Sequence, residues 1–198
     1  MLGIGPLAFV SSLIFIVTNG IKFRRKRITG GRLLIDVIFF IYLLCVLQVT
    51  IFPIPFQKEF LRDYLSSLGS EPRWHYNFIP LMSIVDAVKN IIAFQNYGLE
   101  FKNIGGNIVL LTPLGIYVHF IKRNLVFKKV LFIGFALSAI IELLQFLISL
   151  WLGYSYRSFD VDDLILNTSG FLIGYKSFSL IKKELSNERF ISYDKYHS

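Results

Sequence analysis

Apolar residues lie in long uninterrupted blocks that are separated by shorter polar and basic stretches. Five blocks approach the roughly 20 residues that a helix needs to cross a bilayer, and they cover about 2–21, 33–54, 104–121, 129–151 and 163–181. Only helices or closed barrels satisfy their backbone groups in lipid, and these blocks are too long and too continuously apolar for barrel strands. The pattern predicts an all-α protein, a multi-span transmembrane helical bundle with about five spans, and it leaves four or six spans open.

The polar stretch between the second and third blocks, about 55–103, contains one amphipathic segment. Apolar residues recur there at helical spacing, with polar residues on the other side: Ile79, Met82, Val85, Val88 and Ile92 against Asp86, Lys89 and Asn90. This spacing predicts a helix within 78–93 that lies in the outer membrane interface or re-enters the membrane, and the sequence leaves both arrangements open.

Composition supports a membrane protein and argues against a water-soluble globule. Of the 198 residues, 54% are hydrophobic and 17% are charged, whereas soluble domains carry roughly 25% charged residues. The net charge is +8, but the basic residues form short clusters between apolar blocks, which is typical of membrane topology and not of a nucleic-acid surface. The single cysteine, Cys45, excludes an intrachain disulfide.

The basic clusters predict how the chain is oriented. Most Lys and Arg residues fall after the first block, between the third and fourth blocks, and in the tail. Because basic loops stay in the cytoplasm, we expect the N-terminus outside the cell and the C-terminus in the cytoplasm. The first block is expected to be a retained span, since its basic residues follow it. We divide the chain into an N-terminal helix with its basic loop (1–32), a membrane core (33–181) and a charged tail (182–198).

The fourth block carries a polar face inside an otherwise apolar helix. Glu142 lies about nine residues from the predicted outer end, which is roughly 13 Å deep. One helical face combines it with three other polar residues: Ser138, Glu142, Gln145 and Ser149. Two interpretations stay open, namely polar contacts between helices and a binding or catalytic site. Asp36 needs neither, because Arg32 four residues earlier is placed to pair with it.

Three aspartates precede the last block, at Asp160, Asp162 and Asp163. A helix N-terminus stabilises negative charge, so one of them is expected to be a cap. A polar face then continues along the helix through small residues, on which another helix can pack closely: Asp163, Asn167, Gly170 and Gly174. Capping therefore explains one aspartate and not the whole face.

A third group of polar residues, Asn103 and Asn107, lies at the outer start of the third block, and Pro113 within this block is expected to kink it. We predict one binding site in the outer half of the protein, formed by seven residues: Asn107, Glu142, Gln145, Arg157, Asp160, Asp163 and Asn167. Glu142, Asp160 and Asp163 are the candidate catalytic residues within it. No phosphate-binding loop or clustered histidines occur, so we assign no metal and leave the cofactor open. The sequence leaves one alternative, because carboxylates with asparagine are able to hold a hard cation such as Ca²⁺ or Mg²⁺.

In these residues the chain resembles the VanZ-like family of bacterial membrane proteins over roughly 40–176. Tyr156 stands where that family often has glycine. The residues that carry the resemblance are Asn77-Phe78-Ile79-Pro80, Asn107, Pro113-Leu114-Gly115, Ser138, Glu142-Leu143-Leu144-Gln145, Arg157, Asp160, Asp163, Asn167, Gly170 and Gly174.

The resemblance implies a helical protein of the bacterial cytoplasmic membrane, often from Gram-positive organisms. The founding member is associated with reduced susceptibility to teicoplanin-type glycopeptide antibiotics, but family membership supplies no reaction. Our first hypothesis is a non-transporting factor that lowers access of lipid-anchored glycopeptides to the cell wall, with Arg157 contacting an anionic group.

The alternative is an intramembrane enzyme that acts on a lipid or a lipid-linked cell-envelope intermediate, with Glu142 transferring a proton. A transporter subunit ranks last because no inverted repeat occurs. Expected partners are the bilayer and a lipid-linked or glycopeptide ligand. Oligomeric state stays open.

Overall fold

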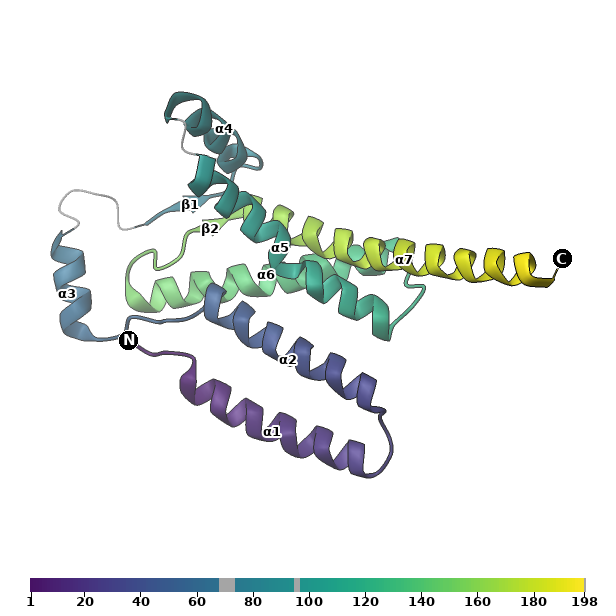
Figure 1. Ribbon diagram of the computed structural model, residues 1–198. Helices are drawn as coiled ribbons and strands as arrows, with labels where there is room; N and C mark the ends of the chain where they lie inside the picture. Colours follow the sequence, from purple (N-terminus) through teal and green to yellow (C-terminus); the bar gives the residue numbers. More distant parts are fainter. Residues whose placement is uncertain (68–73, 95–96, 198) are drawn as a thin grey trace. The chain divides into compact units, whose positions relative to one another are not determined.

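The computed structural model describes residues 1–67, 74–94 and 97–197 and is helical over most of that length. Figure 1 shows the elements along the chain. They are α1 (Gly5–Arg24), α2 (Gly30–Thr50), α3 (Lys58–Ser67), β1 (Tyr76–Asn77), α4 (Met82–Phe94), α5 (Tyr97–Ile121), α6 (Phe127–Leu152), β2 (Phe159–Asp160) and α7 (Val161–His197). The predicted all-α class is confirmed.

Four helices of the described chain are long and apolar enough to cross a membrane. They are α1, α2, α6 and the part of α5 from Glu100 to Ile121. These helices correspond to the first four predicted spans. The fifth predicted segment, 163–181, is helical within α7 but is not among the four, and its role as a span stays a prediction.

The chain forms two compact units. Unit 1 contains residues 1–75 and 144–158, and unit 2 contains residues 76–143 and 159–198. Helix α6 contributes to both, since its residues from Leu144 onward belong to unit 1.

In unit 1, α1 and α2 form an antiparallel hairpin (Figure 1). The rings of Phe15 and Phe40 stack between them, with centroids 4.4 Å apart. Thr29 caps α2 by accepting a hydrogen bond from the backbone of Arg32. The predicted ion pair is confirmed, because Nε of Arg32 lies 3.0 Å from a carboxylate oxygen of Asp36. Helix α3, in the long polar stretch, was not predicted.

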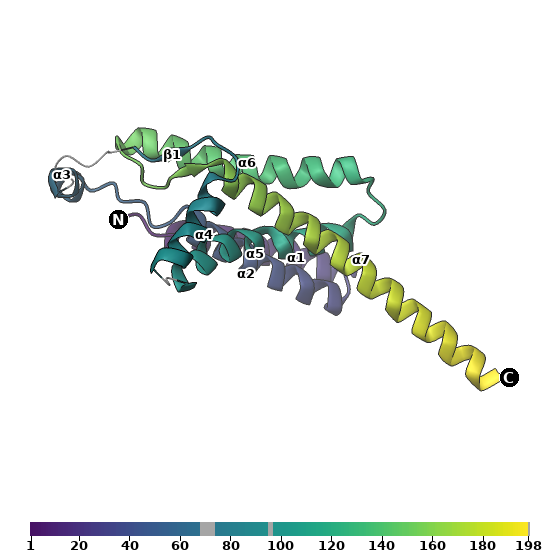
Figure 2. The same ribbon diagram turned by 90° about the horizontal axis from the view of Figure 1, so that it is seen from above.

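In unit 2, α7 runs beside α5, as both views show (Figures 1 and 2). Glycines bring the two backbones together: a Cβ on Gly170 would overlap the carbonyl of Ile108, and a Cβ on Gly174 would overlap that of Thr112. The hydroxyl of Thr112 donates to the carbonyl of Gly170 at 3.1 Å. The sequence prediction that Gly170 and Gly174 admit a close helix is therefore confirmed.

The core of unit 2 lies where three helices meet. Leu111 of α5, Val130 of α6 and Phe171 of α7 are all buried in one apolar cluster. Gly134 faces the ring of Phe171, so a side chain at that position of α6 would collide with it. This packing holds α5, α6 and α7 in one arrangement.

Helix α4 confirms the helix predicted within 78–93. A short parallel pairing precedes it, in which Tyr76 of β1 lies opposite Phe159 of β2. The predicted apolar stripe around α4 is exposed at all five positions: Ile79, Met82, Val85, Val88 and Ile92. An apolar stripe of this kind favours contact with lipid or another surface, and its place in the membrane interface stays a prediction.

Candidate functional site

Asp160 is the N-cap of α7 and also ties α7 to the segment before α4. Its Oδ1 accepts hydrogen bonds from the backbone N–H of Asp162 and from Nδ2 of Asn77, both at 2.8 Å. Its Oδ2 accepts from the hydroxyl of Ser83 at 2.5 Å. The expectation that one aspartate caps the last helix is met by Asp160, because a cap oxygen accepts from the second amide of its helix.

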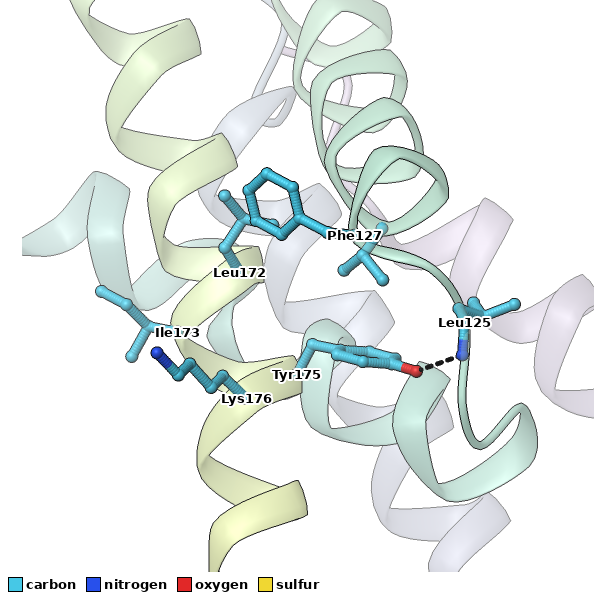
Figure 3. Close-up of a pocket in the computed structure, with 7 residues that line it drawn as sticks. Leu125, Phe127, Leu172, Ile173, Tyr175 and Lys176 are labelled. Atoms are coloured by element: carbon cyan, nitrogen blue, oxygen red, sulfur yellow. Dashed lines mark hydrogen bonds between the residues drawn. The ribbon is translucent and has the colours of Figure 1, made fainter.

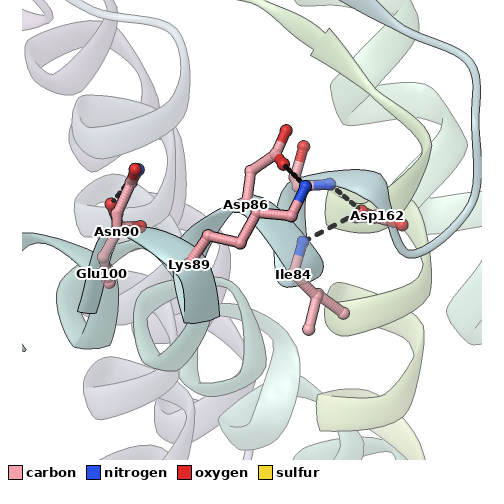
Figure 4. Close-up of polar contacts among 7 residues, drawn as sticks. Ile84, Asp86, Lys89, Asn90, Glu100 and Asp162 are labelled. Carbon is pink, nitrogen blue, oxygen red and sulfur yellow. Dashed lines mark hydrogen bonds and ion pairs between the residues drawn. The ribbon is translucent and has the colours of Figure 1, made fainter. Parts of the chain in front are cut away.

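Asp162 caps a different helix, which the sequence alone did not reveal. Its side chain is fully buried. It accepts from three backbone N–H groups at the start of α4: Leu81 at 2.5 Å, Ser83 at 2.8 Å and Ile84 at 3.4 Å. Figure 4 shows this carboxylate against the first turn of α4. The free amides and positive dipole end of α4 stabilise the charge, so Asp162 anchors α4 to α7.

Asp163 joins α7 to α5. The side-chain amide of Asn107 donates to its carboxylate. Asn167 follows Asp163 by four residues, which places both on one face of α7. Asn107 and Asp163, which come from separate predicted spans, are therefore brought together.

Glu142 brings α6 into the same cluster. It is 2% exposed, and it lies close enough to Asp163 and Asp160 to interact electrostatically with both. We call Asn107, Glu142, Asp160 and Asp163 the carboxylate cluster. It unites α5, α6 and α7 within unit 2.

Three buried side chains of unit 2 keep polar atoms that no other described residue satisfies. These atoms are Oε2 of Glu142, Oδ1 of Asn167 and Oγ of Ser138. Asn167 is 1% exposed and Ser138 is fully buried. A buried polar atom without a partner costs roughly 1–3 kcal/mol, so folded proteins seldom keep one without a reason. In this region they mark unused hydrogen-bonding capacity beside the carboxylate cluster.

In unit 1, Gln145 and Arg157 bind the end of α2. Nε2 of Gln145 donates to the carbonyl of Thr50 at 3.0 Å, and Nη2 of Arg157 donates to that of Val49 at 3.0 Å. The hydroxyl of Tyr156 bonds to the carbonyls of Ile51 and Pro53. The last carbonyls of a helix have no partners within it. Here Gln145, Tyr156 and Arg157 donate hydrogen bonds to the carbonyls at the end of α2 and just after it, and we call these three residues the α2 clamp.

Ser149 completes the inner side of the α2 clamp. It is fully buried, and its hydroxyl lies 2.9 Å from the carbonyl of Gln145 and 3.2 Å from that of Arg157. It also accepts from the backbone N–H groups of Tyr156 and Arg157. One hydroxyl thus holds the chain that leaves α6 against the helix itself.

Residues 39–182 match the sequence profile of a family described as VanZ/LLP1, and this segment is well over half of the chain. The chain belongs to the VanZ/LLP1 family. No curated protein matches it, and no solved structure matches it. Membership agrees with the resemblance drawn from the polar residues, and with the four long apolar helices it identifies a VanZ/LLP1 membrane protein.

Four of the seven predicted site residues of this VanZ/LLP1 protein form the carboxylate cluster, and Asn167 lies on the same face of α7 as Asp163. Gln145 and Arg157 belong to unit 1, and their participation in a site with Glu142 stays a prediction. Sequence reasoning missed the bonding roles of Asn77 and Ser83. Asn77 belongs to the Asn77-Phe78-Ile79-Pro80 motif that carries the family resemblance, whereas no sequence pattern marked Ser83. Among the described residues, no group of three His, Cys, Asp or Glu side chains is placed to hold a metal ion.

Proposed function

We propose that this VanZ/LLP1 membrane protein lowers the susceptibility of a Gram-positive host to teicoplanin-type glycopeptides through an outward-facing polar site. The observation that supports this proposal best is the buried Glu142, whose Oε2 lacks a partner among the described residues. The proposed orientation, with the N-terminus outside and the C-terminus in the cytoplasm, opens the cluster toward the outer leaflet. There it would meet lipid-linked envelope intermediates and the lipid tails of such antibiotics.

The chemistry of the carboxylate cluster favours a ligand with hydrogen-bond donors. A carboxylate oxygen only accepts when it is ionised, and it accepts or donates when it is protonated. Glu142 and Asn167 each offer an oxygen without a partner in the described chain, and both suit the hydroxyl and amide N–H groups of sugars and peptides. Binding to such buried oxygens recovers the free energy that their burial costs.

Arg157 is the residue we propose for an anionic group on the ligand. Its Nη2 is occupied by the carbonyl of Val49, but its Nε is buried and has no partner within the described residues. A guanidinium N–H that faces a carboxylate or phosphate forms a short, charge-assisted bond. Arg157 thus bonds to the end of α2 through Nη2 and keeps its Nε–H for a ligand.

The test is binding of a fluorescent lipoglycopeptide to sensitive Gram-positive cells that express wild type or Glu142→Gln at matched membrane levels. We expect wild type to reduce the bound label and Glu142→Gln to lose this reduction. Asp86→Asn is the control, because Asp86 lies on α4 in a partly exposed ion pair with Lys89. If wild type and Glu142→Gln reduce the bound label equally, Glu142 is not part of the site. If wild type does not reduce the bound label, the proposed protection is refuted.

A second candidate function is an intramembrane enzyme that modifies a lipid or lipid-linked envelope intermediate. The grouping of Glu142 with Asp163 and Asp160 favours it, because a buried carboxylate beside other carboxylates suits proton transfer. Glu142 would transfer the proton, and Asp160 and Asp163 would set its charge environment.

Turnover separates the enzyme from the first proposal. Purified protein is incubated with a lipid extract of the host, and the lipid masses are compared before and after. An enzyme changes a lipid mass with wild type and leaves it unchanged with Glu142→Gln. Unchanged masses in every sample, together with reduced antibiotic binding in cells, favour the non-catalytic factor.

A further inference from the structure

An apolar cavity of about 340 Å³ lies in unit 2 at the turn between α5 and α6. Its volume is at the lower end of the roughly 300–1,000 Å³ typical of small-molecule pockets. Leu125, Phe127 and Val130 line it from the turn and from α6, and α7 supplies Leu172, Ile173, Tyr175 and Lys176 (Figure 3). The lining is thus hydrophobic except for the Tyr175 hydroxyl and the one amine of Lys176.

Tyr175 fixes the wall of this cavity. Its hydroxyl accepts from the backbone N–H of Leu125 at 2.9 Å and donates to the carbonyl of Lys122 at 3.3 Å. Its ring packs edge-on against His119, with centroids 4.6 Å apart. Hydrogen bonds from Tyr175 to both ends of the turn therefore hold the turn against α7, so this wall of the cavity is fixed by the fold.

Positive charge surrounds the cavity without any acidic residue to balance it nearby in the sequence. Neither 101–141 nor 164–183 contains an Asp or Glu. Five basic side chains of these stretches are exposed around the turn and on the first part of α7: Lys122, Arg123, Lys128, Lys129 and Lys176. Clusters of this kind beside membrane helices attract anionic lipid headgroups, at roughly 1 kcal/mol for each basic residue near the surface.

The place of the cavity along the helices indicates a lipid as its occupant. The turn connects two helices that are able to span a membrane, α5 and α6, so it lies where a span leaves the hydrocarbon. Phe127 is 68% exposed and Ile173 is 51% exposed, which suits side chains that face acyl chains. A soluble anion would gain nothing from this apolar lining, whereas a phospholipid matches both the lining and the charge.

We propose that this cavity binds an acyl chain of an anionic glycerophospholipid, whose headgroup is held by Lys176 and the basic residues of the turn. The long stem of Lys176 lies along the apolar wall while its amine reaches the phosphate level. The site is separate from the carboxylate cluster, because Phe127 precedes Glu142 by fifteen residues of α6, or roughly 22 Å. The bound lipid fixes the α5–α6 turn in the bilayer.

Native mass spectrometry of the full-length protein in detergent tests this site. The probes are phosphatidylglycerol and phosphatidylcholine with identical acyl chains. We expect wild type to retain phosphatidylglycerol preferentially, and Lys176→Gln to weaken this binding about fivefold. Ile173→Trp fills the cavity and should weaken both lipids. Lys89→Gln is the matched control, since Lys89 already pairs with Asp86 on α4 at 3.0 Å, and it should bind as wild type does.

Equal retention of the two lipids by wild type would overturn the proposal, as would unchanged phosphatidylglycerol binding in Lys176→Gln. Displacement of the lipid by inorganic phosphate alone would also overturn it, because the acyl chain would then contribute nothing. If Ile173→Trp does not fold, Lys176→Gln decides the question, since Lys176 is exposed and its neutralisation leaves the packing intact. Neither Glu142 nor Asp163 takes part, so these results are independent of the proposed antibiotic phenotype.

Discussion

The two halves of the polar face on α6 contrast in how completely they are bonded. In unit 1, Gln145 donates to the end of α2, and the hydroxyl of Ser149 has two backbone donors and two backbone carbonyls around it. In unit 2, Oγ of Ser138 and Oε2 of Glu142 are buried without partners among the described residues. The polar face of α6 is continuous in the sequence, but its two halves differ in the structure. The half in unit 1 makes structural hydrogen bonds, and the half in unit 2 keeps buried polar atoms without partners among the described residues.

The contrast teaches that a polar residue in an apolar helix is a functional candidate only when the fold leaves its bonds unused. Spacing alone places Ser138 and Ser149 on the same face, and both side chains are fully buried. Their partners distinguish them. The same rule separates Asp162, which accepts three amides, from Glu142.

The largest expected effect comes from removing the anchor of α4. Asp162→Ala leaves three amides at the start of α4 without their acceptor, and we expect it to lower the free energy of unfolding by about 3–5 kcal/mol. Thermal unfolding of the purified protein in detergent measures this. Asp86→Ala, in a partly exposed ion pair, should cost less than about 1 kcal/mol. Equal losses in both variants would show that Asp162 is no anchor.

Close packing of α5 and α7 gives the next effect, and here two glycines should respond with opposite signs. Gly170→Ala forces a Cβ against the carbonyl of Ile108 and should destabilise the protein by about 1–3 kcal/mol. Gly105→Ala, on α5, meets open space and should stabilise the helix by about 0.5–1 kcal/mol. Melting temperatures of the two variants test this, and a stabilising Gly170→Ala would contradict the close packing.

Two serines on α6 test the contrast between its halves directly. Ser149→Ala removes a hydroxyl with several backbone partners and should cost about 2 kcal/mol. Ser138→Ala removes an equally buried hydroxyl without a partner among the described residues, so it should be neutral or stabilise by up to about 1 kcal/mol. The two melting temperatures are compared at one detergent concentration. Equal destabilisation would mean that the two hydroxyls are equally bonded.

The helices were predictable because their signal is long and local. Apolar blocks marked α1, α2, α5 and α6, and the spacing of Met82, Val85 and Val88 marked α4. The close approach of another helix to α7 was predictable from Gly170 and Gly174, since only small residues admit so close a contact, but the structure was needed to identify that helix as α5. Helix α3 was missed although it is amphipathic, because it is only 10 residues long and lies in a polar stretch, whereas the prediction rested on long apolar blocks.

The site was predictable in its residue types and not in its bonds. Seven residues were expected to form one site. Of these, Asn107, Glu142, Asp160 and Asp163 lie together in unit 2, and the site as a whole stays a prediction. Asp162 was expected only as one of three possible caps for its own helix, but it caps α4, about eighty residues earlier in the chain. A bond over that separation depends on tertiary packing, which one sequence does not encode in any local pattern. The cavity beside Tyr175 was missed for the same reason.

The most direct test measures two properties of the Glu142→Gln protein: the protection that it gives cells against a teicoplanin-type antibiotic, and its melting temperature. This substitution preserves the shape of the side chain and removes its charge and acid–base chemistry, so we expect stability to change by less than about 1 kcal/mol while protection is lost. A stable Glu142→Gln protein that protects as wild type does would contradict the claim that the incompletely bonded half of α6 carries the function.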